Sequence, residues 1–487
     1  MKDLLLFNKI NKISKKIKME DKSFYVFANS SLNINKAHPE YLNLFKQKKI
    51  ITFKKILIYL LKGIYMILLS IIESFKNIKQ KKNTIISKID FDVILISNLL
   101  TSNKKKNNDL YFKGVSNILK KKKIKYLKVF INNLGLRKTE KKFIPKKGEK
   151  SFTINCNISF ISLINIYYGV IKKFVKFFFL SYQVKGIEHK IYKIVSLEFL
   201  NPTTVNNLIL KKKFEIFFSN YRCKNLVYTL EGFSWEKMIA ISFKKMQPKN
   251  NLIGYQFASL LEFQNIKDNN LNKIYFPDIV WTSGKINYVI LKNEFKKVVN
   301  IGTDRQYKEK NKVFKNFSKF NCLVIPEGIN SECNKILNFS ITCAKKFPNI
   351  KFIWRFHPLI NLNLIFKSIN EEDKFPTNIE ISKKNLVDDI SRSSFFLYRG
   401  STAAITSLQK GLHPLYLNLN QSINIDPIYK FKKWKTTINT IYEFEKFINK
   451  QFNRILSQSN RRNQGIYFAN KYFMKLNSSK IYSSLNL

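Results

Sequence analysis

The order of apolar and polar positions along the chain predicts a parallel α/β fold. Between residues 91 and 133, a continuous apolar run, a polar loop, a stretch with helical spacing and a second apolar run follow one another. Continuous apolar runs of this length are typical of parallel strands, because helices cover both faces of a parallel sheet. The same order returns over residues 225–258, and a further short strand is expected within 277–284. These elements predict one Rossmann-like domain.

A second series of strands and helices begins near Val298. Its predicted strands are 298–305, 320–328, 351–358, 394–400 and 413–419, and its predicted helices are 331–347 and 401–411. The predicted fold class is therefore α/β, with two Rossmann-like domains facing a cleft. The expected divisions are an N-terminal extension over 1–89, a first, acceptor-binding domain over 90–297, a second, nucleotide-donor-binding domain over 298–427 and a helical segment over 428–487.

Two apolar stretches in the first half of the chain raise the question of a membrane. Residues 56–72 are apolar except for Lys62, whereas a membrane span needs about 20 apolar residues. We expect an interfacial or buried helix there, with a true span as the alternative. The second stretch, 158–182, sets three lysines on one expected helical face and three phenylalanines opposite: Lys172, Lys173, Lys176, Phe174, Phe178 and Phe179. It predicts an amphipathic, membrane-contacting helix, with a buried helix as the alternative.

Composition and charge limit the classes of binding partner that the chain is expected to have. Apolar residues make up 45% of the 487 positions, which excludes a disordered chain. The formal net charge of +55 comes mostly from lysine, which an AT-rich genome favours together with Ile, Asn, Phe and Tyr. Because no nucleic-acid-binding motif accompanies the charge, we rank an anionic membrane surface above nucleic acid as a partner.

The cysteines and the N-terminal residues bear on the compartment. The five cysteines are scattered without paired spacing, which fits a reducing cytoplasm. Residues 1–16 are too rich in lysine for a secretory signal. We expect a cytoplasmic protein held peripherally on the inner face of the plasma membrane.

Candidate chemistry collects where the predicted strands of the second domain end, the edge at which open parallel sheets bind ligands. His357 follows a strand, and its imidazole suits a phosphate oxygen or a leaving oxygen that needs a proton. Gly400, Ser401 and Thr402 lie between a strand and a helix, where a close backbone, two hydroxyls and free amides favour a phosphate. A loop histidine and ordinary helix caps are the alternatives.

This pattern, a strand with His-Pro and a later strand followed by Ser-Thr and a helix, resembles GT-B-fold transferases that use cytidine-activated donors. They include bacterial sialyltransferases, capsular Kdo transferases and CDP-glycerol glycerophosphotransferases. The segments 109–112 and 231–236 are similar to those of surface carbohydrate biosynthesis proteins. The resemblance implies that His357, Ser401 and Thr402 contact the donor phosphate.

Acidic residues at other strand ends are candidates for the catalytic base and for hydroxyl binding. Sialyltransferases carry a catalytic carboxylate before a glycine, and Glu231 takes that position here, although only one acid precedes the glycine. Glu236 is the next candidate, with a helix-start partner as the alternative. Glu327, ranked above Glu332, is expected to hold a ribose or sugar hydroxyl. Arg305 is expected to reach the donor phosphates, because a guanidinium fork suits phosphate oxygens.

Together these observations predict an inverting glycosyltransferase of surface polysaccharide biosynthesis, such as capsule, O-antigen or lipopolysaccharide. His357 and Glu231 are its candidate catalytic residues. Its expected partners are a nucleotide-activated sugar, CMP- or CDP-linked by the resemblance, and a glycan or lipid-linked acceptor. No cofactor and no metal are expected, because the Asp-x-Asp at 90–92 precedes a strand. The alternatives are a CDP-polyol phosphotransferase and a non-catalytic basic protein that binds membrane or nucleic acid.

Overall fold

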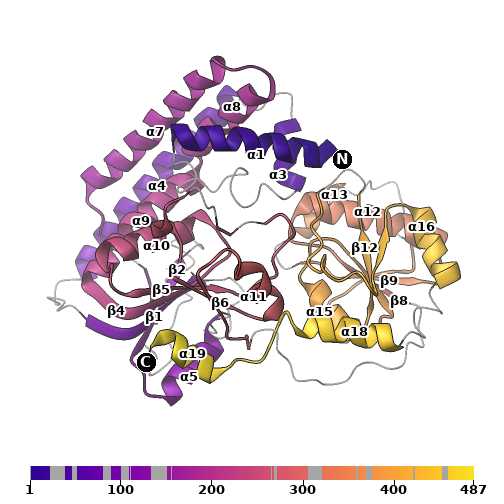
Figure 1. The fold of residues 1–487 in the computed structure, drawn as a ribbon. Helices are drawn as coiled ribbons and strands as arrows, with labels where there is room; N and C mark the ends of the chain where they lie inside the picture. The colour runs from indigo at the N-terminus through magenta and orange to yellow at the C-terminus, as the bar shows by residue number, and fades with distance from the viewer. Residues whose placement is uncertain are drawn as a thin grey trace.

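The computed structural model shows a chain organised around two parallel sheets, each covered by helices (Figure 1). It describes residues 2–21, 39–46, 52–80, 89–99, 109, 111–132, 151–154, 156–264, 266–267, 271–304, 321–357, 360–368, 376–419, 423–451 and 459–486.

The first sheet has seven strands in the order β3-β2-β1-β4-β5-β6-β7, and every neighbouring pair is parallel. Its centre, β1 beside β4, is the apolar run that the sequence predicts to be buried. The strands are β1 (Ile89–Leu99), β2 (Tyr126–Asn132), β3 (Ser151–Thr153), β4 (Tyr221–Thr229), β5 (Asn251–Gln256), β6 (Ile279–Thr282) and β7 (Lys297–Asn300). The helices α5 (Lys113–Lys121), α9 (Pro202–Asn220), α10 (Ser234–Met246) and α11 (Lys285–Leu291) belong to this domain, with the short 3-10 helix Lys273–Tyr275.

The second sheet has six parallel strands in the order β10-β9-β8-β11-β12-β13. Read along the chain, this is the doubly wound order 3-2-1-4-5-6 of a Rossmann fold. The strands are β8 (Asn321–Ile325), β9 (Lys351–Trp354), β10 (Ile379–Ile381), β11 (Phe395–Tyr398), β12 (His413–Leu417) and β13 (Thr436–Ile438). Helices α12 (Asn330–Lys346), α13 (Leu362–Ser368), α14 (Leu386–Ser391) and α15 (Ala403–Gln409) connect them. Two Rossmann-like domains are therefore confirmed.

Two expected boundaries differ from the structure. The strand that the sequence assigns to the start of the second domain, near Val298, is β7, which pairs with β6 at the edge of the first sheet. The second sheet also runs beyond Pro427, its expected end, because β13 pairs with β12. A three-residue strand carries too few apolar positions to be recognised by pattern.

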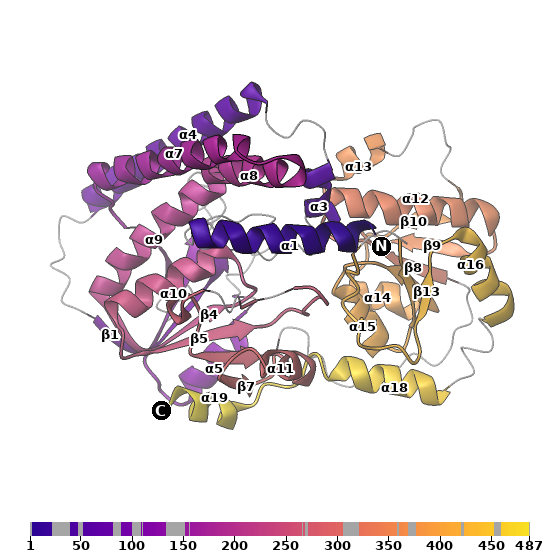
Figure 2. The same ribbon diagram turned by 45° about the horizontal axis from the view of Figure 1, so that its top comes forward.

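The C-terminal segment returns from the second domain to the first. After α16 (Ile441–Lys446) and a π-helix (Phe447–Gln451), α18 (Ser459–Asn470) packs on α15, whereas α19 (Ser478–Leu485) packs near β7 (Figure 2). Trp281 Nε1 donates a hydrogen bond to Ser484 Oγ at 2.9 Å, and Asn225 Nδ2 donates to the Leu485 carbonyl at 3.0 Å. The end of the chain therefore joins both domains.

A layer of helices from the N-terminal half covers the first domain. It contains α1 (Lys2–Glu20), α3 (Pro39–Lys46), α4 (Phe53–Gln80), α7 (Phe160–Tyr182) and α8 (Gly186–Leu200). The apolar helix expected at 56–72 lies inside α4. Within α4, Phe53–Ser74 is long and apolar enough to cross a membrane by length and composition, with a mean hydropathy of 2.0, and 17% of it is buried.

The predicted faces of α7 differ from the structure. Phe179, expected opposite the lysines, is 64% exposed, and Phe177 is the phenylalanine that the helix buries. Lys173 instead turns inward and pairs with Asp21. Phe174 and Phe178 are four residues apart and lie on one face, where their ring centroids are 5.6 Å apart, whereas Phe179 follows Phe178 directly and is turned away from that face.

Candidate functional site

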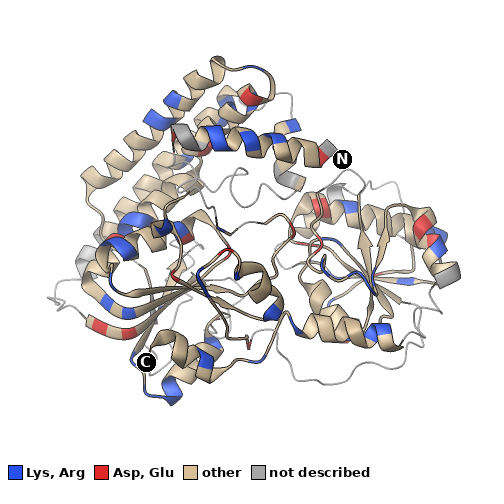
Figure 3. Ribbon diagram, viewed as in Figure 1, with Lys and Arg blue, Asp and Glu red and all other residues tan. Residues whose placement is uncertain are grey.

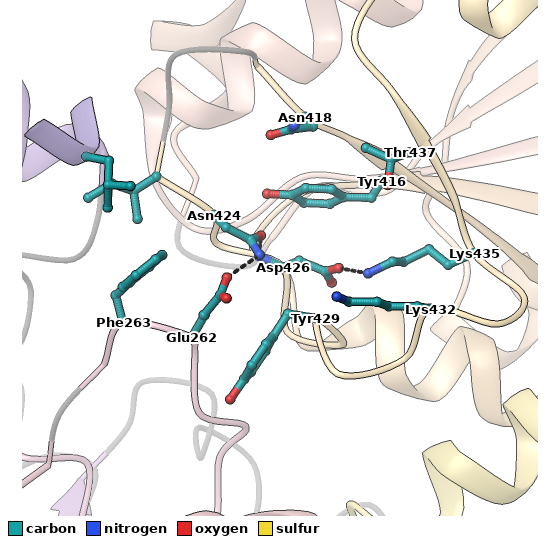
Figure 4. A pocket seen from close by; sticks show the side chains of 12 residues that line it. Glu262, Phe263, Tyr416, Asn418, Asn424, Asp426, Tyr429, Lys432, Lys435 and Thr437 are labelled. Carbon is teal, nitrogen blue, oxygen red and sulfur yellow. Dashed lines mark hydrogen bonds and ion pairs between the residues drawn. The ribbon is translucent and has the colours of Figure 1, made fainter. Parts of the chain in front are cut away.

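A cavity of about 550 Å³ lies between the two domains (Figure 4). Its size is within the range of about 300 to 1,000 Å³ that is usual for ligand sites. The first domain contributes a loop after β5 and the N-terminal region contributes α1, whereas the second domain contributes β12, β13 and the segment between them. The lining residues are Leu4, Glu262, Phe263, Tyr416, Asn418, Ile423, Asn424, Asp426, Tyr429, Lys432, Lys435 and Thr437.

The second-domain wall is held by the buried carboxylate of Asp426. Tyr398 Oη donates a hydrogen bond to Asp426 Oδ1 at 3.0 Å, and Lys435 pairs with Oδ2 at 2.5 Å. Burial raises the pKa of Asp426, and Lys435 opposes this by lowering it. The side chains of Asp426 and Lys435 are both nearly buried, at 1% and 9% exposure, so the pair fixes the loop that carries Tyr429 and Lys432.

A direct hydrogen bond joins the domains across the cavity. Asn424 Nδ2 donates to Glu262 Oε2 at 2.6 Å (Figure 4). Glu262 lies in the loop after β5, and the neighbouring Gln264 donates to the backbone carbonyl of Glu231 at 3.4 Å. The carboxyl ends of β4 and β5 are thus turned toward the same opening as β12.

A second group of polar residues lies along the same edge of the second sheet. Glu327 follows β8, His357 follows β9, and Gly400 follows β11. A Cβ atom at Gly400 would lie 2.3 Å from Glu327 Oε2, and one at Gly328 would lie 2.8 Å from His357 Nδ1. The Glu327 carboxylate and the His357 ring thus lie directly against the backbone of these two glycines. The structure therefore brings Glu327, His357 and Gly400 together.

The electrostatics of this group are mixed. Burial lowers the pKa of His357, and the nearby Glu327 carboxylate opposes this by raising it. The net lowering favours the neutral imidazole at pH 7, which can accept or donate a proton. Ser401 is buried and Thr402 is exposed at the start of α15. A carboxylate against Gly400 favours hydroxyl donors there and disfavours a phosphate directly over this glycine.

Glu332 lies below this edge in a buried ion pair. Arg399 Nε donates to Glu332 Oε2 at 2.6 Å, Lys335 Nζ donates to Oε1 at 2.5 Å, and the Glu332 side chain has no exposed surface. Burial would raise the pKa of Glu332, but Arg399 and Lys335 lower it overall. The structure thus gives Glu332 an ion-pair role in place of the ligand-facing position expected from the sequence.

Arg399 connects the two groups of polar residues. Its Nη1 donates to the Leu417 carbonyl at 2.7 Å, directly between Tyr416 and Asn418 in the cavity wall. Strands β9, β8, β11 and β12 are successive neighbours, so the residues that follow β9 and the cavity wall after β12 lie three strand positions apart along the same edge of the sheet. The cavity and the His357 group therefore form one extended edge.

Glu231 and Glu236 have different surroundings at the end of β4. Glu236 is buried and accepts backbone hydrogen bonds from Glu231 at 2.7 Å, Gly232 at 2.5 Å and Phe233 at 2.9 Å. It is a helix-start acceptor, which was the alternative that the sequence left open. Glu231 is half-buried and does not line the cavity.

Several functional candidates were not visible in the sequence. Glu262, Asn424 and Lys432 lie in loops without periodic pattern, and the segment after Pro427 was expected to be outside the domain. An Asp-Pro dipeptide and a lysine cluster were the available signals. Arg305 and Pro358 lie outside the described residues.

Comparisons with known proteins concern the fold. No protein-family model and no curated protein matches the chain. Similar solved structures include CalG4, the calicheamicin glycosyltransferase, with a TM-score of 0.47, 8% identity and coverage of 81% of this chain and 98% of that one. A UDP-GlcNAc 2-epimerase from Neisseria meningitidis bound to UDP-GlcNAc has a TM-score of 0.46 and 12% identity, and the match covers 81% of this chain and 99% of that one. The spinosyn rhamnosyltransferase SpnG complexed with thymidine diphosphate has a TM-score of 0.46 and 9% identity, and the match covers 81% of this chain and 100% of that one.

The two doubly wound parallel sheets, with a cavity between them, form a GT-B-like architecture.

Proposed function

We propose that the chain is a glycosyltransferase that binds a nucleotide-activated sugar between its two Rossmann-like domains. The observation that carries the proposal is the cavity of about 550 Å³ at the carboxyl edge of the second sheet, the edge along which His357 also lies. Ligands of doubly wound sheets bind outside this edge. Aromatic, amide and charged side chains in one wall suit a ligand with a base, hydroxyls and phosphates.

The proposed donor lies along this edge. Tyr429 and Phe263 offer aromatic faces in the cavity, and Lys432 offers an exposed charge for a phosphate. Ser401 and Thr402 are the hydroxyl donors that the resemblance implies for the donor phosphate, placed beside Gly400 and not directly over it. Glu327 accepts from a ribose or sugar hydroxyl, because its carboxylate lies against Gly400.

The proposed reaction is an inverting displacement. A base takes the proton of the acceptor hydroxyl, the acceptor oxygen bonds to the anomeric carbon, and the bond from that carbon to the donor phosphate breaks. The nucleotide leaves with the bonding electron pair, and neutral His357 is suited to exchange a proton there. Glu231 is the base that the resemblance implies, and Glu262 is the first-domain carboxylate in the cavity wall.

The proposal also extends to the nucleotide of the donor and to the acceptor. A cytidine-linked donor and an acceptor in surface polysaccharide rest on the His-Pro and Ser-Thr pattern of the second domain. The metal-free mechanism rests on the absence of a recognisable ligand motif in the sequence.

A thermal-shift panel of CMP, CDP, UDP, GDP and ADP tests the donor, because a ligand that binds the folded state raises its melting temperature. We expect a cytidine nucleotide to stabilise the wild type and the shift to be lost in His357→Ala. Selectivity for UDP or GDP would contradict the cytidine donor, and no response to any nucleotide would contradict the proposed function. Release of free nucleotide from a responding donor, accelerated by acceptor glycolipid, then tests transfer.

A further inference from the structure

Helix α7 carries an exposed apolar stripe. Its exposed apolar residues recur at three- and four-residue spacings, so they lie on one side of the helix. They are Phe160, Ile161 (71% exposed), Ile164, Tyr168, Val175, Phe179 (64%) and Tyr182. Residues on the other side, such as Leu163, Val170 and Phe177, are buried against the protein. A soluble helix ordinarily turns polar residues outward, and this one turns apolar residues outward.

Helix α4 carries a second exposed stripe of the same kind. Its members are Phe53, Leu57, Ile58, Leu61, Ile64, Tyr65, Leu68 and Ile72, with exposed fractions from 37% to 81%. The opposite side contains Gly63, Ile67, Ser70 and Ser74, which are buried. Helices α4 and α7 contact each other, and Figure 2 shows them side by side on the outer side of the first domain. The two stripes together make one large apolar surface, here called the α4–α7 face.

Contacts along its length attach α4 to the protein. Tyr167 Oη on α7 donates to the Leu60 carbonyl at 2.9 Å, and a Cβ at Gly63 would lie 2.8 Å from the Tyr167 ring. Ser74 Oγ accepts from the Ile158 amide at 3.2 Å, and Glu73 pairs with Lys213 of α9. A helix crossing the bilayer alone would lose these bonds. The contacts therefore fit a helix that lies flat with one side exposed.

Positive charge borders the α4–α7 face. Lys54 and Lys62 on α4, and Lys172 and Lys176 on α7, are exposed. Helix α7 contains no acidic residue and shows only lysine colouring in Figure 3. Lysine stems extend along apolar surface and set their ammonium groups at the level of lipid phosphates. Two copies of the chain would bring these lysines together, which disfavours a self-paired face at a net charge of +55.

We propose that the α4–α7 face is a docking surface for an anionic bilayer, in which both helices lie in the interface with their apolar stripes among the acyl chains. Amphipathic helices with lysine beside the apolar stripe bind in this manner. The surface belongs to the first domain, so it would hold the cleft close to a lipid-borne acceptor. The docking does not depend on the proposed glycosyl transfer.

Co-sedimentation of the full chain with lipid vesicles tests the proposal. We expect binding to vesicles of mixed phosphatidylcholine and phosphatidylglycerol and weaker binding to phosphatidylcholine alone. The double variant Ile161→Glu/Phe179→Glu should lower the vesicle partition constant at least about tenfold, because two apolar side chains that insert among the acyl chains are replaced by carboxylates. Lys172→Ala/Lys176→Ala should lower binding to the anionic vesicles by about fivefold or more, and should leave the weak binding to phosphatidylcholine unchanged.

Tyr442→Glu is the matched control, since Tyr442 is 70% exposed on α16 of the second domain. It should bind vesicles as the wild type does, and equal melting temperatures establish that the variants are folded. Equal binding of Ile161→Glu/Phe179→Glu and Tyr442→Glu would overturn the proposal. A dimer in light scattering that Ile161→Glu/Phe179→Glu converts to a monomer would assign the face to a second copy, and retention of the wild type on vesicles after carbonate extraction would indicate a spanning α4.

Discussion

The buried ion pair between Glu332 and Arg399 lets the cost of one substitution be estimated from the structure. Replacing Glu332 by Gln keeps the shape of the side chain but removes its charge, which leaves Arg399, 1% exposed, without its carboxylate at 2.6 Å. Removing one partner of a buried pair costs about 3 to 5 kcal/mol of folding free energy. Because Gln keeps one oxygen and Lys335 is 34% exposed and can turn to water, we expect a loss of about 3 kcal/mol.

Urea unfolding followed by tryptophan fluorescence, to which Trp354 and Trp434 of the same domain contribute, measures this loss. The control is Glu445→Gln, whose pair with Lys346 at 2.6 Å is in the same domain but exposed at 30% and 45%. Exposed pairs contribute about 0 to 1 kcal/mol. If Glu332→Gln cost no more than Glu445→Gln, the claim that the buried pair stabilises the domain more than an exposed pair does would be refuted.

Three further predictions follow from other residues. Gly400→Ala should weaken nucleotide binding at least about tenfold in calorimetry, because its Cβ would displace the Glu327 carboxylate, whereas Gly169→Ala, with nothing within 4 Å, should not change it. Burial lowers the pKa of His413 to about 3, so the unfolded chain takes up the proton first and stability should fall as pH drops below about 6.5, with a slope of up to about 1.4 kcal/mol per pH unit; His413→Gln should flatten this slope in pH-dependent melting curves. Glu236→Gln should cost about 2 kcal/mol in urea unfolding, because an amide cannot accept from all three backbone N–H groups that it faces.

The sheets could be predicted from the sequence because the apolar pattern of a strand is local. The cavity could not be predicted, because its walls come from segments that are far apart in the sequence. Continuous apolar runs identified β1, β4, β8 and β11, and the rule that ligands bind at the carboxyl edge indicated that Glu327, His357 and Gly400 converge. The partner of a strand depends on tertiary pairing, so β7 was assigned to the wrong sheet.

The same limit applies to Glu332 and to the cavity. The sequence predicted a hydroxyl-binding role for Glu332, because nothing near it in the sequence indicates that it pairs with Arg399, 67 residues away. Asn424 and Glu262 meet across 162 residues and lie in loops that carry no periodicity. Sequence patterns therefore located the edge of the site and missed the wall that closes it.

The central claim, that the interdomain cavity holds the nucleotide of the donor, is tested most directly by calorimetric titration of three proteins with the nucleoside phosphate that stabilises the wild type. Lys432 lines the cavity, and the adjacent Lys433 is equally exposed but does not line it. We predict that Lys432→Ala weakens binding by about tenfold, the effect of one lost charge-assisted phosphate contact, and that Lys433→Ala leaves the affinity unchanged. Equal affinities for all three proteins would contradict the assignment of the cavity as the donor site.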